Sequence, residues 1–258
     1  MELDLFFFER WYLFLVILAR MAAMVGSLPI FTSSRAAIRI RLGVAVAISL
    51  LLFPVLDFSL SQQQMTSVGF GLIILQQALL GLLLGFVVQL IFFAVQFGAT
   101  IVGYQMGFAA AEILDPQYQQ QVPLLSQFQN AIAILIFLAL DVHHIIFRVI
   151  VRSYKLLPPG DMNITGNAVP YIVAMTGEMF VLGIQLVIPV LMVLMLSMFI
   201  LGIMSRVFSQ LQVFMLSFPI NISLALIIIG LSMQMVVFIL GREFQGLQER
   251  LLYILQLV

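Results

Sequence analysis

The chain has 258 residues, of which 63% are hydrophobic and only 9% are charged, and its mean hydropathy is +1.19. A soluble protein of this length cannot bury so much apolar surface, so the composition excludes a soluble globular domain and indicates a membrane protein or a subunit of a membrane complex. The net charge of zero gives no electrostatic basis for nucleic-acid binding. The apolar runs are continuous rather than alternating, which favours an all-α fold over a β-barrel and leaves no room for a sizeable second domain.

Two apolar segments are predicted near the start, at about 5–25 and 42–56. The first is long enough to span a bilayer, and its acidic beginning lacks the basic region of a signal peptide, so we expect it to be retained. It carries Arg10 and Arg20, and an arginine inside a spanning helix needs a partner. The second segment is short for a membrane crossing, and an alternative is that its helix starts earlier, within the basic cluster at 35–41. Such a cluster indicates the cytoplasmic side.

The third segment, 65–106, contains no charge and no proline and is about twice as long as one bilayer crossing requires. It is either one long helix or a tight hairpin. As one helix, it collects small and polar residues on a single face. These residues are Gly81, Gly85, Gln89, Gln96, Thr100, Gly103 and Gly107. Two pairs of glycines at a spacing of four let helix backbones approach closely, so we interpret the face as a packing stripe, with a pore-facing stripe as the alternative.

A central interruption at 107–123 reads GFAAAEILDPQYQQQVP. Proline disfavours helix at the residue before it, so we expect helix to end near Asp115 and to restart near Pro123. Because lipid offers this backbone no hydrogen bonds, the segment needs water, a cavity or a protein partner. It is either a solvated connector between two membrane helices or a loop inside a conduit.

Three further apolar segments follow, at about 124–151, 169–203 and 213–240. Pro189 is expected to kink the second of these. A second basic patch lies at 148–155, and the tail that follows the last segment is amphipathic, so it is predicted to lie on a surface.

Three charges are predicted to be buried: Arg20, Glu178 and Arg206. An unpaired carboxylate in an apolar run is costly, so we expect Glu178 to pair with one of the two arginines. The alternative is a neutral Glu178 that is hydrogen-bonded to a neighbouring subunit.

The charged loops conflict with a simple membrane topology. The basic clusters at 35–41 and 148–155 belong on one side, and the acidic loops at Asp57 and at Glu112 and Asp115 belong opposite. Both conditions hold only if the third segment crosses an even number of times. The third segment is therefore a hidden hairpin, or the chain is not a conventional bilayer bundle.

Catalytic chemistry is poorly represented, so an enzyme is disfavoured and we expect no cofactor and no metal. The sequence has no phosphate-binding glycine loop and no cysteine. Asp141, His143 and His144 are the one cluster that resembles a metal or acid-base site, but adjacent histidines on a helix point about 100° apart. Structural or interfacial histidines are the favoured reading.

Several stretches together resemble the FliR family, the flagellar export-gate subunit, whose injectisome relatives are the T-type export-apparatus subunits. The stretches are Arg20, LPIF (28–31), RIRLG (39–43), the long glycine- and glutamine-bearing segment, Gly107–Phe108, Asp115–Pro116, FLALDVHH (137–144), Ser153, Pro158 and SRVFSQLQVFMLSFPINI (205–222). The match covers nearly the whole chain. It departs from the family pattern at Ser209, Gln212 and Asn221, where proline, asparagine and lysine are usual.

The resemblance implies a helical subunit that assembles with FliP and FliQ and is contacted by FlhB, at the flagellar basal body in the bacterial inner membrane. It implies a FliP-like portion at about 1–200 and a FliQ-like portion at about 201–258. It also implies that the central segment is a plug in a conduit for unfolded export substrates. The residues assigned to this plug are Gly107, Phe108, Glu112, Ile113, Leu114, Asp115, Pro116, Tyr118 and Pro123. An injectisome subunit or a stand-alone secondary transporter is the alternative.

Overall fold

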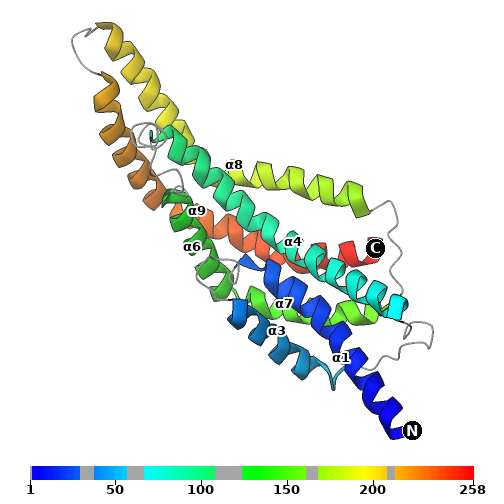
Figure 1. Cartoon of the computed structure of the whole chain (residues 1–258). Helices are drawn as coiled ribbons and strands as arrows, with labels where there is room; N and C mark the ends of the chain where they lie inside the picture. Colours follow the sequence, from blue (N-terminus) through cyan, green and yellow to red (C-terminus); the bar gives the residue numbers. More distant parts are fainter. Residues whose placement is uncertain (1, 30–37, 57–66, 108–123, 161–167, 208–212) are drawn as a thin grey trace. The chain divides into compact units, whose positions relative to one another are not determined.

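In a computed structural model, the chain folds into α-helices without any strand in the residues that the structure describes (Figure 1). Those residues are 2–29, 38–56, 67–107, 124–160, 168–207 and 213–258. The helices are α1 (Glu2–Ser27), α3 (Ile38–Leu52), α4 (Ser67–Gln105), α6 (Leu124–Ala139), α7 (Val142–Leu156), α8 (Ala168–Val207) and α9 (Val213–Leu257). The prediction of an all-α fold is confirmed.

Four of the described helices, α1, α4, α8 and α9, are long and apolar enough to cross a membrane, and the number rises to five if α6 and α7 count as one broken span. By contrast, α3 has only 15 residues. It begins at Ile38, so the basic residues Arg39 and Arg41 lie inside its first turn. The earlier start that the sequence left open is therefore the correct one.

The third apolar segment is a single helix of 39 residues, so the hairpin alternative is wrong. The helix ends at Gln105, and the position near Asp115 where helix is predicted to fail lies outside the described residues. Gly107 has a φ of 90°, a conformation that glycine adopts at helix C-termini, and its N–H donates to the carbonyl of Tyr104 at 3.0 Å. α6 begins at Leu124, next to the restart of helix predicted near Pro123.

The chain divides into two compact units, each built from segments that are distant in sequence. The first unit comprises 1–90, 141–175 and 245–258. Its C-terminal segment corrects the expectation of a surface-lying tail, because Leu247, Leu251 and Ile254 are fully buried. The apolar face of this amphipathic segment is therefore part of the protein interior.

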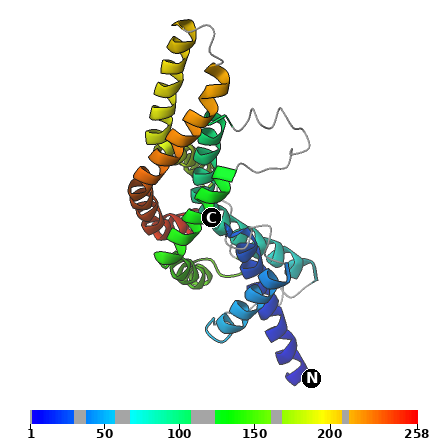
Figure 2. The ribbon, with the colours of Figure 1, turned by 90° about the vertical axis from the view of Figure 1, so that its left-hand side faces the viewer.

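The second unit comprises 91–140 and 176–244. Phe92, Phe137 and Phe244 form an aromatic cluster in it, with ring centroids 5.5–5.8 Å apart. In the same unit α8 and α9 run side by side in opposite directions (Figures 1 and 2). Ser197 Oγ on α8 donates a hydrogen bond of 2.8 Å to Asn221 Oδ1 on α9, which satisfies two polar groups inside this apolar pair.

Proline and glycine shape α8. The helix contains Pro189, and its ribbon changes direction along its length, as expected of an internal proline (Figure 1). The backbones of α8 and α4 are close to each other at Gly183 and Gly98. A Cβ added to Gly183 would lie only 2.7 Å from the carbonyl oxygen of Ala94. The absence of a side chain at this crossing lets the two helices approach closely.

Candidate functional site

The most buried charge in the described chain is Arg20 of α1, whose exposed fraction is 0%. Its Nε donates to Gln77 Oε1 of α4 at 2.7 Å. Its Nη1 donates to Ser153 Oγ of α7 at 2.8 Å, and its Nη2 donates to the carbonyl oxygen of Leu157 at 3.0 Å. One guanidinium therefore ties together three helices of the first unit, because its rigid fork presents donors in several directions at once.

An aromatic ring completes the surroundings of Arg20. The guanidinium carbon lies 4.0 Å from the ring centroid of Tyr154, a distance at which the ring face attracts a cation. The Tyr154 hydroxyl in turn donates to the carbonyl oxygen of Ile17 at 3.2 Å. Neutral dipoles and a π-face thus surround this charge in place of a carboxylate.

This arrangement corrects the expected pairing of Arg20 with Glu178. The hydrogen bonds of the guanidinium go to Gln77, Ser153 and Leu157, and Glu178 is exposed on the chain. Arg206 is exposed as well, so of the three charges predicted to be buried only Arg20 is buried within the chain. Contact of Glu178 with a neighbouring subunit stays a prediction.

The glycine face of α4 has two different halves. Toward its N-terminus it packs on α1, because a Cβ on Gly81 would meet the carbonyl oxygen of Arg20 and one on Gly85 would meet the side chain of Ser27. Further along, Gln89 is half-buried and Gln96 is exposed. The close approach predicted for the first glycine pair is therefore present, and a pore-facing role for the glutamines stays a prediction.

Gln77 extends this face by one turn, since it lies four residues before Gly81. Its side chain is fully buried, and its Nε2 has no hydrogen-bond partner within the described parts of the chain. Sequence reasoning missed Gln77 as a partner of Arg20. The available signal was its spacing from the glycine pair, which places it on the side of α4 that faces α1.

Replacing Gly81 with alanine is expected to destabilise the chain by about 1–3 kcal/mol, because the new methyl group would press on backbone that cannot move aside. Gly71 on the same helix is the matched control, since its Cβ position has nothing within 4 Å. Alanine at position 71 is expected to stabilise by about 0.5–1 kcal/mol through helix propensity. Thermal unfolding of both variants tests the difference in sign. Equal effects at the two positions would contradict the packing role of Gly81.

Gly107 is the one residue of the central segment 107–123 that the structure describes. Gly107 lies against the ring of Phe218 of α9, and a Cβ on Gly107 would clash with that ring. Its positive φ and this contact both favour glycine. The other residues assigned to the plug lie outside the described residues, namely Phe108, Glu112, Ile113, Leu114, Asp115, Pro116, Tyr118 and Pro123.

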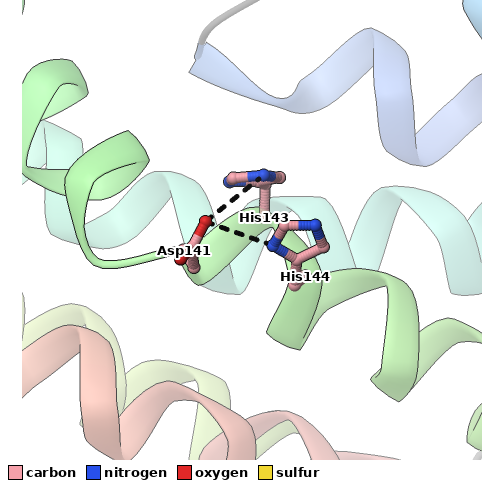
Figure 3. Close-up of side chains that lie close together, drawn as sticks. All are labelled: Asp141, His143 and His144. Carbon is pink, nitrogen blue, oxygen red and sulfur yellow. Dashed lines mark ion pairs between the residues drawn. The ribbon is translucent and has the colours of Figure 1, made fainter.

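Asp141, His143 and His144 come together at the start of α7 (Figure 3). The Oδ1 atom of Asp141 lies 3.3 Å from His144 Nδ1 and 3.9 Å from His143 Nε2. The two imidazole rings are only 4.1 Å apart, so the predicted divergence of adjacent histidines does not separate them. Asp141 has a left-handed backbone with a φ of 53°, which returns its carboxylate toward both rings.

This group has the residue types that bind divalent metals, and its ligand atoms all lie within 4.8 Å of one another. It is also open to solvent, with side chains of Asp141 and His144 that are 72% and 61% exposed. Water competes strongly for ligand atoms that are this exposed. The Asp141 side chain makes no capping hydrogen bond to α7, so the geometry supports neither a side-chain cap nor an enclosed catalytic centre.

Comparison with known proteins identifies the family. The family model described as "Bacterial export proteins, family 1" matches residues 11–247. The chain belongs to this family. The matched range includes the Arg20 cluster, the long helix α4, the central segment and the histidine pair.

Relatives in this family carry the name flagellar biosynthetic protein FliR. The protein from Pectobacterium carotovorum is 30% identical over 84% of this chain and 82% of its own length. The protein from Bacillus subtilis is 28% identical over 95% of each chain, and that from Escherichia coli K12 is 27% identical over 88% of each. The resemblance to the FliR family is thereby confirmed, together with the place of the chain among flagellar export proteins.

Proposed function

We propose that the chain is a structural, conduit-forming core subunit of the flagellar type III export gate in the bacterial inner membrane. In this proposal it assembles with FliP and FliQ and is contacted by FlhB, and unfolded flagellar subunits pass through the assembly. Residues 1–200 take the place of a FliP-like portion and 201–258 that of a FliQ-like portion. The family match carries the proposal, because it covers most of the chain and its relatives are named for flagellar biosynthesis.

The single long helix α4 supports an unconventional arrangement. A single helix crosses a membrane once, which is an odd number of crossings. The basic loops and the acidic loops then cannot lie on opposite sides of the membrane, as the charge pattern requires in a simple bundle. A helical core that stands partly out of the membrane plane removes the conflict. The loops then need not alternate across one bilayer.

Exposed apolar surface on α8 and α9 supports assembly with other subunits. Large side chains stand exposed on both helices, including Phe199 at 67% and Phe238 at 73%. Apolar patches of this kind mark contacts with lipid or with protein neighbours. In the proposed gate the neighbouring helices of FliP and FliQ cover them.

The chain purified alone is expected to be unstable or aggregated, and the chain co-expressed with FliP and FliQ is expected to elute as one stable complex. The reason is that, in the proposed gate, helices of FliP and FliQ rather than lipid cover the exposed apolar surface of α8 and α9. Size-exclusion chromatography in detergent with mass-spectrometric identification of the co-purifying subunits measures this directly. A folded, monodisperse monomer that transports a small solute by itself would support the transporter alternative and contradict the gate.

The transporter alternative fits the described residues less well. A transport site near the membrane midplane needs ionisable groups that can exchange partners. Arg20 is instead held by three hydrogen bonds inside the first unit, while Glu178 and Arg206 are exposed on the chain. The names of the relatives favour the flagellar system over the injectisome alternative, because the three relatives described above are all flagellar biosynthetic proteins.

A further inference from the structure

The outer face of α7 carries three cations that no part of the proposed function uses. Arg148, Arg152 and Lys155 are spaced by four and three residues, which places them on one side of the helix. All three are exposed. The opposite side of α7 is buried and includes Ser153 and Tyr154, the residues that hold Arg20. The helix therefore has a fixed inner face and an open basic face.

None of the three cations forms an ion pair with a carboxylate in the described parts of the chain, and α7 itself contains no acidic residue. A hydrogen bond of 3.4 Å runs from Arg148 Nε to the carbonyl oxygen of His144. Among the described residues, three adjacent positive charges therefore lack a carboxylate partner, an arrangement that favours an anion from outside the chain.

The same face is hollowed. A depression of about 480 Å³ is lined by Phe147, Arg148, Val151, Arg152 and Lys155. All five residues belong to α7, so in the described structure the depression is a shallow, open part of the helix surface. Phe147 and Val151 add apolar surface beside the three cations. Apolar surface beside cations matches a molecule with both an anionic head and an apolar body.

We propose that this face of α7 binds the headgroup of an anionic phospholipid. The phosphate lies among Arg148, Arg152 and Lys155, and the upper part of an acyl chain covers Phe147 and Val151. Basic residues beside apolar membrane segments attract anionic lipids, and the chain has at least four helices of membrane-spanning character. An acidic protein surface would neutralise the cations equally well but would not need the apolar side chains of Phe147 and Val151 beside them. The proposal rests on the membrane character of the chain and is independent of the export-gate assignment.

The test uses the full chain in detergent, in the form that purifies, alone or with its co-expressed subunits. Native mass spectrometry counts bound lipid after titration with phosphatidylglycerol or cardiolipin, with phosphatidylcholine as the neutral comparison. The variant Arg148→Gln/Arg152→Gln is expected to weaken binding of the anionic lipids at least about tenfold. The control Arg206→Gln/Arg242→Gln removes the same charge elsewhere and is expected to bind as the parent does. Glycerol-1-phosphate, which lacks acyl chains, is expected to compete poorly.

Several outcomes would overturn the proposal. Equal lipid retention in the parent and the Arg148→Gln/Arg152→Gln variant excludes the site. Loss of an associated protein subunit with unchanged lipid binding assigns the face to a protein partner instead. Effective competition by glycerol-1-phosphate identifies a phosphate site without a lipid. If the double variant fails to fold, Lys155→Gln on the same exposed face replaces it, and a parent-like lipid titration for that variant would likewise count against the site.

Discussion

Replacing Arg20 with methionine is expected to lower the free energy of unfolding of the first unit by about 3–5 kcal/mol. The substitution leaves Gln77 Oε1, Ser153 Oγ and the carbonyl of Leu157 without their donor in a dry interior. It also removes the cation that lies over the Tyr154 ring. Because natural domains have only about 5–15 kcal/mol of net stability, the variant should accumulate poorly in membranes. Immunoblotting of membranes and thermal unfolding in detergent measure the two effects.

Arg206→Met is the matched control, since Arg206 is exposed and its loss should change stability by at most about 0.5 kcal/mol. Arg20→Lys is expected to be damaging too, because a single ammonium group cannot reproduce the guanidinium fork that reaches three acceptors on α4 and α7. A stable, well-accumulating Arg20→Met variant would show that the buried network does not organise the first unit.

The helical framework was predictable because hydropathy is a local property. The long apolar runs are helical in the described residues, although the predicted segment 124–151 is divided into α6 and α7, and Leu124 begins α6 where proline chemistry places it. The end of α4 was less accessible, since it depends on the backbone conformation of Gly107 and on the ring of Phe218, which comes from a distant segment. The burial of Leu251 in the C-terminal tail likewise depends on tertiary packing, which an amphipathic pattern alone does not specify.

The part of the candidate site that follows from regular helical spacing, the glycine pair on α4, was predictable from the sequence. Gly81 and Gly85 lie four residues apart, so they share a face in any α-helix. The partners of Arg20 were not predictable in this way, because Gln77 and Ser153 lie 57 and 133 residues away in sequence. Reasoning from charge alone favoured an acidic partner, whereas several neutral acceptors and one aromatic ring satisfy this arginine together.

Deletion of several residues within 109–121 is expected to leave the gate assembled but leaky. The segment has properties that suit a plug: a glycine- and alanine-rich approach, apolar residues such as Phe108 and Leu114 that block a narrow passage, and a neutral glutamine run that stays hydrated. In the proposed gate, removing this segment is expected to open the conduit to small solutes, while the helices on either side are expected to remain in place. Phe108→Ser is expected to give a milder leak, since it removes one blocking side chain.

The most direct test of the conduit is solute leakage in cells that co-express the complete gate with either the intact or the deleted chain. Ion or dye entry is recorded together with recovery of the assembled complex, so that failed assembly is recognised as such. The account predicts normal recovery of the complex and markedly faster entry with the deletion, and an intermediate rate with Phe108→Ser. A deleted gate that assembles fully and stays as tight as the intact one would show that residues 107–123 are only a connector, and would contradict the account.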